Sequence, residues 1–217
     1  MLLWQLITSW TVSHVPLAGA LAPRTWIVKF VGANFMLGWL AANFPIRPPV
    51  LLVRHSCAVT ASEWWRGWSN PHLRRLKGFL ARRPQFTDHL ETLRDPTEFA
   101  AALWSMQTYA ALTLPRPWPF VLITYENLAA DPRAELSRLF NAWQMPLPEG
   151  VLDRALRPSG ATGMDSALRA GSDPPSAWRQ SLSTAQIDAI LGVIATFGLH
   201  FSNAGPKPDL ARLATLG

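Results

Sequence analysis

The chain has 217 residues, of which 49% are hydrophobic and 16% are charged, and lysine and arginine outnumber aspartate and glutamate by 20 to 14. This composition excludes an intrinsically disordered chain and suits one globular domain. The single cysteine, Cys57, excludes a disulfide framework and a cysteine-based zinc site. The formal charge of +6 fits an anionic partner, such as a phosphorylated small molecule, a nucleic acid or a membrane surface.

The first half of the chain begins with elements of alternating type. The β-rich run at residues 26–31 predicts a first strand, and apolar side chains at helical spacing predict a helix over residues 34–43. The continuous apolar run at 50–53 predicts a strand buried on both faces, and Ser56 is expected to cap the helix that follows. Residues 70–94 are basic and irregular, which indicates a lid or an insertion.

The second half continues the alternation. Asp-Pro pairs at 95–96 and 131–132 predict helix starts, and residues 120–124 predict a second buried strand. A capping box predicts a last helix between Ser183 and Gly198. Apolar strands that alternate with helices predict an α/β fold with a parallel sheet. We predict one domain over residues 1–202, followed by a loose tail at 203–217.

Polar side chains follow the two predicted buried strands, at 50–53 and 120–124. In parallel sheets, ligands bind beyond the carboxyl ends of the strands. Arg54 leaves the first strand, and Ser62 lies eight positions later, so a guanidinium and a hydroxyl near a helix start suit a phosphate monoester. Tyr125 follows the second strand, where its ring could contact a flat base. Taken singly, Arg54 also fits a surface salt bridge, Ser62 an ordinary helix hydroxyl and Tyr125 a core side chain.

Four segments in this order resemble the bacterial-type sulfotransferases that use 3′-phosphoadenosine 5′-phosphosulfate (PAPS), over roughly residues 26–201. The spacing of Arg54 and Ser62 looks like the family's 3′-phosphate motif. Tyr125-Glu-Asn-Leu is similar to its Tyr-Glu-Asp-Leu stretch, whose tyrosine contacts adenine. The segments Arg-Pro-Ser at 157–159 and Leu-Arg-Ala-Gly at 168–171 resemble two later elements that close over the nucleotide. The resemblance thus implies a site for PAPS, or its product PAP, made by Arg54, Ser62, Tyr125, Ser159, Arg169 and Gly171.

The resemblance also implies a fold and an activity. The fold is a three-layer α/β sandwich related to the P-loop nucleotide kinases, with a parallel sheet flanked by helices. The activity is transfer of a sulfuryl group from PAPS to a hydroxyl or amine of a small-molecule or glycan acceptor, without a metal. Neither nucleic-acid binding nor a membrane span is expected, and the oligomeric state stays open. We expect a cytoplasmic protein, because no basic residue precedes the apolar N-terminal stretch.

The chain departs from the family pattern in two places. The atypical segment at 1–25 lacks the glycine-rich 5′-phosphosulfate loop, as if the N-terminal strand and loop were truncated. A degenerate, non-catalytic nucleotide-binding or interaction protein is therefore the alternative function. The general base also stays open. Lys29 matches a family lysine, but Val31 occupies the position of the expected histidine, so His55 and Glu63 are further candidates.

Tryptophans supply candidates for an acceptor pocket. One interpretation is that they line an apolar pocket beside the nucleotide, which residues 70–94 would cover. The other is that they fill the core, as the helical spacing of Trp39 and Trp104 indicates. The set comprises Trp39, Trp64, Trp65, Trp68 and Trp104.

Overall fold

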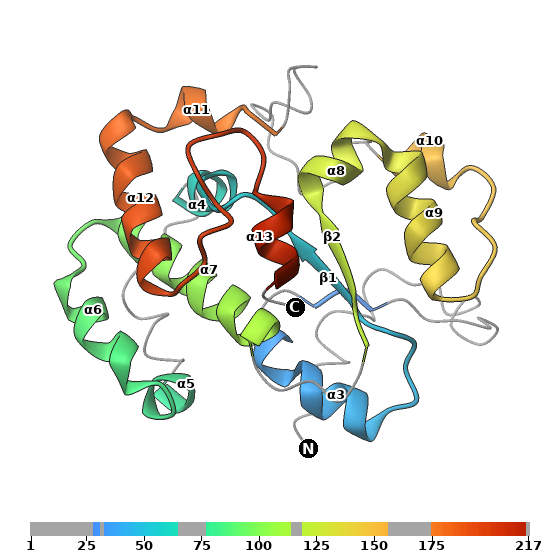
Figure 1. Cartoon of the computed structure of the whole chain (residues 1–217), viewed down its shortest axis with the longest axis horizontal. Helices are drawn as coiled ribbons and strands as arrows, with labels where there is room; N and C mark the ends of the chain where they lie inside the picture. The colour runs from blue at the N-terminus through green and yellow to red at the C-terminus, as the bar shows by residue number, and fades with distance from the viewer. Residues whose placement is uncertain (1–27, 31–32, 65–76, 114–118, 156–174, 216–217) are drawn as a thin grey trace, which may run out of the picture. The chain divides into compact units, whose positions relative to one another are not determined.

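A computed structural model describes residues 28–30, 33–64, 77–113, 119–155 and 175–215 (Figure 1). The chain divides into two units, Met1–Val31 and Gly32–Gly217, and all described helices and strands belong to the second. This second unit is mixed α/β and mostly helical, and its described residues form a parallel sheet of two strands. No described helix is long and apolar enough to cross a membrane.

The described helices and strands follow one another along the second unit. In chain order the elements are η1 (Ala33–Met36), α3 (Leu37–Asn43), β1 (Val50–Val53), α4 (Ser56–Trp64), α5 (Lys77–Ala81), η3 (Pro84–Phe86), α6 (Thr87–Thr92), α7 (Pro96–Thr113), β2 (Val121–Thr124), α8 (Tyr125–Ala130), α9 (Pro132–Ala142), α10 (Val151–Ala155), α11 (Trp178–Ser181), α12 (Thr184–Thr196) and α13 (Leu210–Thr215).

The sheet confirms two of the three predicted strands, at 50–53 and 121–124, and their parallel pairing. Val50 lies opposite Val121, and Val53 lies opposite Thr124 at the carboxyl end. Because β1 and β2 are direct hydrogen-bonded neighbours, the ladder leaves no room for another strand between them. The pairing places the residues that follow each strand, which are far apart in sequence, at one edge of the sheet.

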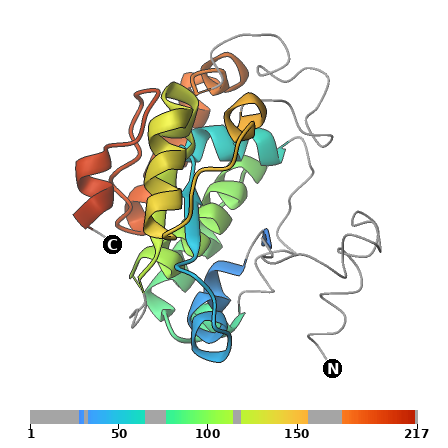
Figure 2. The same ribbon diagram turned by 90° about the vertical axis from the view of Figure 1, so that its right-hand side faces the viewer.

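The two faces of the sheet pack against different side chains. Leu51 and Val53 belong to the larger core cluster, which also contains residues of α4, α7 and α12. Val121 and Ile123 belong to a smaller cluster with α9, and Figure 2 shows α9 and α7 on opposite sides of the strands. On the side that α9 covers, Leu52 of β1 is still 54% exposed. The prediction of a strand buried on both faces is therefore wrong at Leu52, because α9 packs on β2 and leaves this part of β1 open.

The central helix α7 is buried around most of its circumference. It packs against both α4 and α12, and its alanines allow these helices to approach closely. The predicted start is confirmed, since the Asp95 side chain accepts the N–H of Thr97 at 2.6 Å. Glu98 reinforces the start by accepting the N–H groups of Arg94 and Asp95 at 2.7 and 3.0 Å. These bonds satisfy backbone N–H groups at the exposed start of α7, which would otherwise have no partner within the helix.

The later helices also begin and end as the sequence predicts. The side chain of Asp131 accepts the N–H of Ala134 at 3.0 Å and caps α9. Ser183 and Gln186 form the predicted capping box of α12. After α12, Gly198 adopts a φ of +71°, a left-handed conformation that favours glycine.

Residues 77–94 are more ordered than the predicted irregular lid. They form α5, η3 and α6, and Phe79, Phe86 and Leu93 are buried in the larger cluster. The ring of Phe86 stacks on Phe197, with 4.4 Å between ring centroids. The irregular-segment prediction is wrong for these residues, because their apolar side chains recur every seven positions among the charges and anchor the segment to the core.

The predicted loose tail is also wrong over its described part. Pro208 is buried, and so is Leu213 on α13. The N–H of Asp209 donates to the carbonyl oxygen of Phe201 at 2.6 Å, and the Asp209 carboxylate accepts the N–H of Arg212 at 3.2 Å. These bonds form a short helix that presents Leu213 to the core.

The two earliest predicted elements have different outcomes. The helix predicted over 34–43 is confirmed, as a short 3-10 turn that leads into α3. The strand predicted over 26–31 is wrong for its described residues, 28–30, which are not in a strand and expose Val28 and Phe30. An apolar β-rich run forms a strand only where it pairs with a neighbour, and no described residue pairs with these three.

Candidate functional site

Two predicted ligand residues meet at the carboxyl ends of β1 and β2. The guanidinium carbon of Arg54 lies 4.6 Å from the ring centroid of Tyr125, a cation–π contact. Both side chains are half-buried, and Tyr125 is the first residue of α8. The parallel ladder explains this contact, since each residue directly follows its strand.

Ser62 lies on the helix that follows β1, as predicted. Its side chain is exposed and lies six residues after the first residue of α4. At the usual helical rise this is roughly 9 Å from the helix start. No hydrogen bond joins Ser62 to Arg54 among the described residues, so a ligand would have to bridge the two side chains.

His55 is fully buried between the strand end and the C-terminal part of the chain. Its ring stacks on Trp178 with 4.8 Å between centroids and 9° between planes. Nε2 lies 2.9 Å from the carbonyl oxygen of Asn203, and Nδ1 accepts the N–H of Cys57 at 3.2 Å. A carbonyl oxygen only accepts, so the proton is on Nε2 and the imidazole is neutral.

The surroundings of His55 favour packing over catalysis. Burial lowers the pKa of His55 to about 4, and the charges of Arg179 and Arg54 lower it further, against the opposing effect of the Asn203 bond. Both ring nitrogens are already bonded to the protein. Of the open interpretations of His55, the geometry fits a packed side chain beside Arg54 rather than a general base.

Glu126 is a site residue that the sequence reasoning missed. It is fully buried, and its Oε1 accepts the N–H of His55 at 2.8 Å, which ties the start of α8 to the end of β1. Burial raises the pKa of this carboxyl, while the bond from His55, a bond to its own backbone and the charge of Arg54 oppose the rise. Its position beside Tyr125 was visible in the sequence, but an acidic residue in a first helical turn normally indicates only a helix start.

Several polar atoms in this region are buried without a hydrogen-bond partner among the described residues. They are Arg54 Nε, Ser56 Oγ, Glu126 Oε2 and Trp178 Nε1. Ser56 therefore does not cap α4 as predicted. It is the first residue of the helix, and His55 accepts the neighbouring N–H instead. An unpartnered buried polar group costs roughly 1–3 kcal/mol, so these atoms retain unused capacity to bind a polar ligand or water.

Cys57 lies in the same turn and has no reactive character. The thiol is fully buried, and burial raises the pKa of Cys57 to about 11. A thiol with a raised pKa is a poor nucleophile at neutral pH. The prediction of a packed small side chain is confirmed.

The other predicted site residues fall into three groups. Lys29 is exposed and belongs to the unit Met1–Val31. Glu63 is part of α4, but its side chain is not among those described. Three predicted cofactor ligands lie outside the described residues, namely Ser159, Arg169 and Gly171.

The tryptophan candidates are divided in the same way. Trp104 is buried beside Phe201, with 5.9 Å between centroids, which confirms its core interpretation. Trp39 is 45% exposed, so the core interpretation is wrong for it. Trp65 and Trp68 lie outside the described residues, and so does the side chain of Trp64.

The strand-end site can thus be defined by its contacts. Arg54 and Tyr125 present a cation and an aromatic ring at the edge of the sheet, and Glu126 and His55 hold the backbone beneath them. Comparison of the chain with protein-family models, with curated proteins and with solved structures finds no match.

Proposed function

We propose that the carboxyl ends of β1 and β2 bind a 3′-phosphorylated adenine nucleotide, and that the chain is a sulfotransferase-like protein that uses PAPS. The observation that carries the proposal is the contact between Arg54 and Tyr125 across the parallel ladder. A cation and an aromatic ring at one strand edge match the two parts of such a nucleotide, its phosphate and its base.

Each side chain has a role that its chemistry supports. The guanidinium of Arg54 offers a planar set of donors to a phosphate monoester, and its Nε is buried with no partner among the described residues. Tyr125 offers an aromatic face for adenine, and the exposed hydroxyl of Ser62 adds a donor from α4. Ser159, Arg169 and the Gly171 backbone would complete the site. Because Arg54 covers the Tyr125 ring, nucleotide binding would draw the guanidinium away from the ring toward the phosphate.

The proposal extends to the wider fold and the reaction. Core clusters on both faces of the two strands are in keeping with a three-layer sandwich related to the P-loop nucleotide kinases. In the proposed reaction, an acceptor hydroxyl or amine attacks the sulfur of PAPS, the bond from sulfur to the phosphate oxygen breaks, and PAP leaves. The acceptor proton passes to a general base.

A second candidate is a nucleotide-binding protein without transferase activity. The observation that favours it is the direct ladder between β1 and β2, which leaves no place between them for the donor-loop strand of a complete family member. Residues 1–25 also lack the glycine-rich loop that would hold the 5′-phosphosulfate. Under this alternative the Arg54 and Tyr125 site still binds PAP.

Calorimetric titration with PAP tests nucleotide binding directly. The full chain should bind PAP more tightly than 5′-AMP, which lacks the 3′-phosphate. Arg54→Ala should weaken PAP binding by about 1.5–3 kcal/mol, or about 10- to 150-fold, because a charge-assisted bond is lost. Arg133→Ala, at an exposed position on α9, is the matched control and should bind like the parent chain. Equal PAP affinity of Arg54→Ala and the parent would reject the site.

A transfer assay separates the two candidate functions. Labelled PAPS is incubated with the chain and a panel of hydroxyl and amine acceptors, and transfer of label is measured. Transfer that disappears in Arg54→Ala but persists in Arg133→Ala supports the enzyme. PAP binding with no transfer to any acceptor supports the non-catalytic alternative.

A further inference from the structure

Two of the buried atoms without a partner among the described residues are complementary to each other. One is a donor, Nε of Arg54, and the other is an acceptor, Oε2 of Glu126. A guanidinium N–H and a carboxylate oxygen form a stronger hydrogen bond than neutral groups do, because both carry charge. Two such groups left buried and unpaired destabilise the region, and a movement that joined them would remove this penalty.

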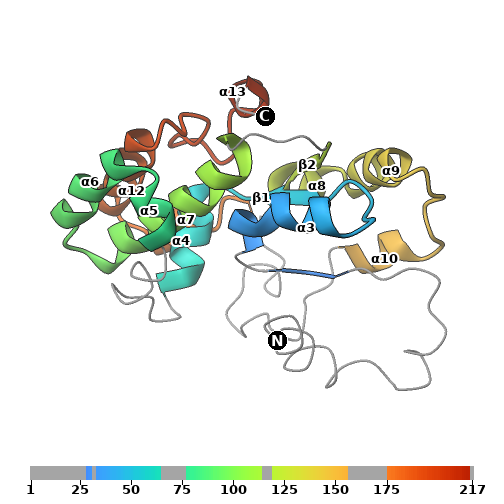
Figure 3. The same ribbon diagram turned by 90° about the horizontal axis from the view of Figure 1, so that it is seen from below.

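The contacts around these atoms make Arg54 and Glu126 neighbours. Oε1 of Glu126 accepts the N–H of His55 at 2.8 Å, and Arg54 directly precedes His55 in the chain. The guanidinium carbon of Arg54 lies 4.6 Å from the ring centroid of Tyr125, which directly precedes Glu126. Both contacts join the end of β1 to the start of α8, and Figure 3 shows α8 beside the two strands. Burial raises the pKa of Glu126, and the charge of Arg54 opposes this rise, as expected for groups that lie close together.

We propose that Glu126 is a positioning residue that directs Arg54 toward the phosphate of the nucleotide, an inference that rests on the proposed function. Without a nucleotide, the guanidinium lies over the Tyr125 ring and Oε2 of Glu126 has no partner among the described residues. When adenine takes the ring face, the guanidinium leaves it and Nε donates to Oε2. The terminal nitrogens of Arg54 then remain for the phosphate. Because the guanidinium is planar, a bond at Nε fixes the direction of both terminal nitrogens.

The two carboxylate oxygens of Glu126 therefore have separate roles. Oε1 holds the backbone at His55, and Oε2 orients Arg54. A carboxylate accepts at both oxygens, whereas the amide of glutamine has one acceptor oxygen and a nitrogen that only donates. Glu126→Gln can therefore accept from the N–H of His55 or from Nε of Arg54, but not from both.

The same substitution separates positioning from a simple effect of charge. Glu126→Gln removes a negative charge near the proposed phosphate position, and this change alone would strengthen the binding of an anion. Loss of the bond to Arg54 would weaken the binding instead. The two explanations thus predict PAP affinities that change in opposite directions.

Calorimetric titration of the full chain with PAP tests the inference. Glu126→Gln should bind PAP about tenfold or more weakly than the parent, because the guanidinium loses a charge-assisted bond that orients it. Thermal unfolding verifies that the variant is folded, since it keeps an acceptor for the N–H of His55. Glu135→Gln is the matched control. It removes a carboxylate on α9 that pairs with Arg138, and it should bind PAP like the parent.

A second background shows whether the effect acts through Arg54. In Arg54→Ala the guanidinium is absent, so the addition of Glu126→Gln should change the remaining PAP affinity by less than about twofold. Two outcomes would overturn this inference alone: PAP binding by Glu126→Gln that equals or exceeds that of the parent, or the same loss of affinity with and without Arg54. No PAP binding by the parent, or equal PAP affinity of Arg54→Ala and the parent, would instead reject the proposed function and this inference with it.

Discussion

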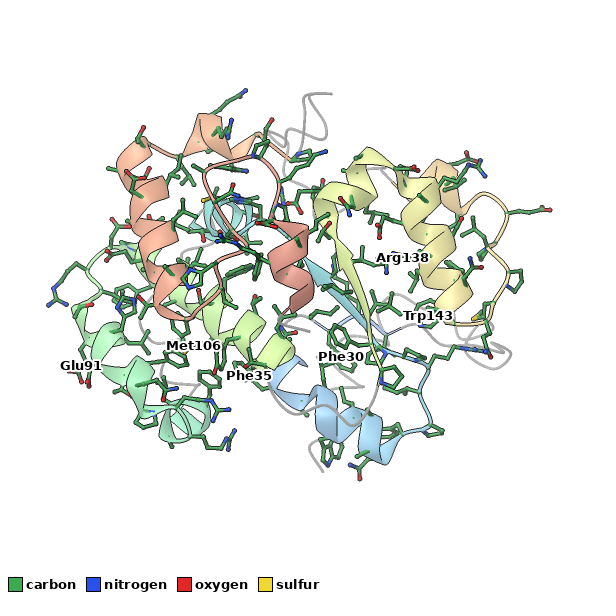
Figure 4. All side chains as sticks on the ribbon, in the orientation of Figure 1. Phe30, Phe35, Glu91, Met106, Arg138 and Trp143 are labelled. Carbon is green, nitrogen blue, oxygen red and sulfur yellow. The ribbon has the colours of Figure 1, made fainter. Side chains whose placement is uncertain are left out.

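The packing around α7 and the strand-end site are adjacent, and α4 contributes to both, but they are built from different side chains. Around α7 the buried residues are almost all apolar or small, as Met106 and Leu112 illustrate, and Figure 4 shows Met106 among other side chains of this core. At the strand ends, the fully buried His55 and Glu126 carry ionisable groups, whereas the buried polar side chains of α7, such as Thr97 and Ser105, carry only neutral hydroxyls. The first region supplies stability. The second retains polar groups at a cost in stability, which is typical of sites that bind a ligand.

The largest expected effect is on the core. Met106→Ala should lower the free energy of unfolding by about 2–5 kcal/mol, because it removes a fully buried side chain and leaves a cavity. Met36→Ala is the matched control at an exposed position and should change stability by less than about 0.5 kcal/mol. Urea unfolding measures both. Similar losses in the two variants would contradict the assignment of the core.

The strand-end site should make stability depend on pH through His55. The folded chain protonates His55 only below about pH 4, whereas the unfolded chain protonates it below about pH 6.5. Between these values the unfolded chain binds more protons, so stability falls as the pH drops from 6.5 to 4. The loss is on the order of 3 kcal/mol. Urea unfolding at a series of pH values should show this slope in the parent but not in His55→Gln.

A control histidine separates this effect from general acid sensitivity. His200 is exposed, so His200→Gln should keep the slope of the parent. Glu126 has the opposite dependence, since its raised pKa favours the folded state at low pH and this contribution is lost as the pH rises. The His55 contribution is therefore the difference between the parent and His55→Gln. Identical slopes in those two proteins would refute it.

Glu126 tests whether one buried bond supports the site. Glu126→Ala leaves the N–H of His55 without its acceptor and should cost about 1–3 kcal/mol of unfolding free energy. Glu126→Gln keeps an acceptor oxygen, so it should lose less stability than Glu126→Ala, and because it removes the buried charge its stability relative to the parent should rise with pH. Thermal unfolding compares the three proteins. Equal losses in the two variants would show that the acceptor oxygen does not matter.

The smallest expected effect is at the helix starts. Asp95→Ala and Asp131→Ala each remove an N-terminal cap and should each cost about 1 kcal/mol. The costs should be similar although α7 belongs to the large core and α9 to the small cluster, because capping is a local interaction. Urea unfolding of both variants makes the comparison. A cost several times larger at Asp95 would mean that the cap also supports the packing of α7.

Local signals in the sequence predicted much of the fold. The capping side chains of α7, α9 and α12 accept backbone N–H groups at most three residues further along the chain. Sequence spacing was therefore enough to predict where these helices begin. The strands at 50–53 and 121–124 were recognisable as short apolar runs between turn residues. By contrast, the order of residues 77–94 and 203–213 comes from distant contacts, such as Phe86 with Phe197, that no local pattern contains.

The candidate site shows the same division. The contact of Arg54 with Tyr125 followed from one rule, that residues after parallel strands meet at one edge of the sheet. The bond between Glu126 and the N–H of His55 joins a side chain to a backbone group 71 residues away. Leu52 is likewise exposed because α9, which is distant in sequence, packs on β2 and does not cover this part of β1. Neither feature has a local signature in the sequence.

A double-mutant cycle tests the central claim, that Arg54 and Tyr125 form one nucleotide site, most directly. PAP affinity is measured by calorimetry for the parent, Arg54→Ala, Tyr125→Leu and the double variant. Because the two side chains are in contact and share one ligand, the account predicts that both single changes weaken binding and that the double change departs from their sum by about 0.5–3 kcal/mol. Losses that add without coupling, or a PAP affinity that neither change alters, would contradict the account.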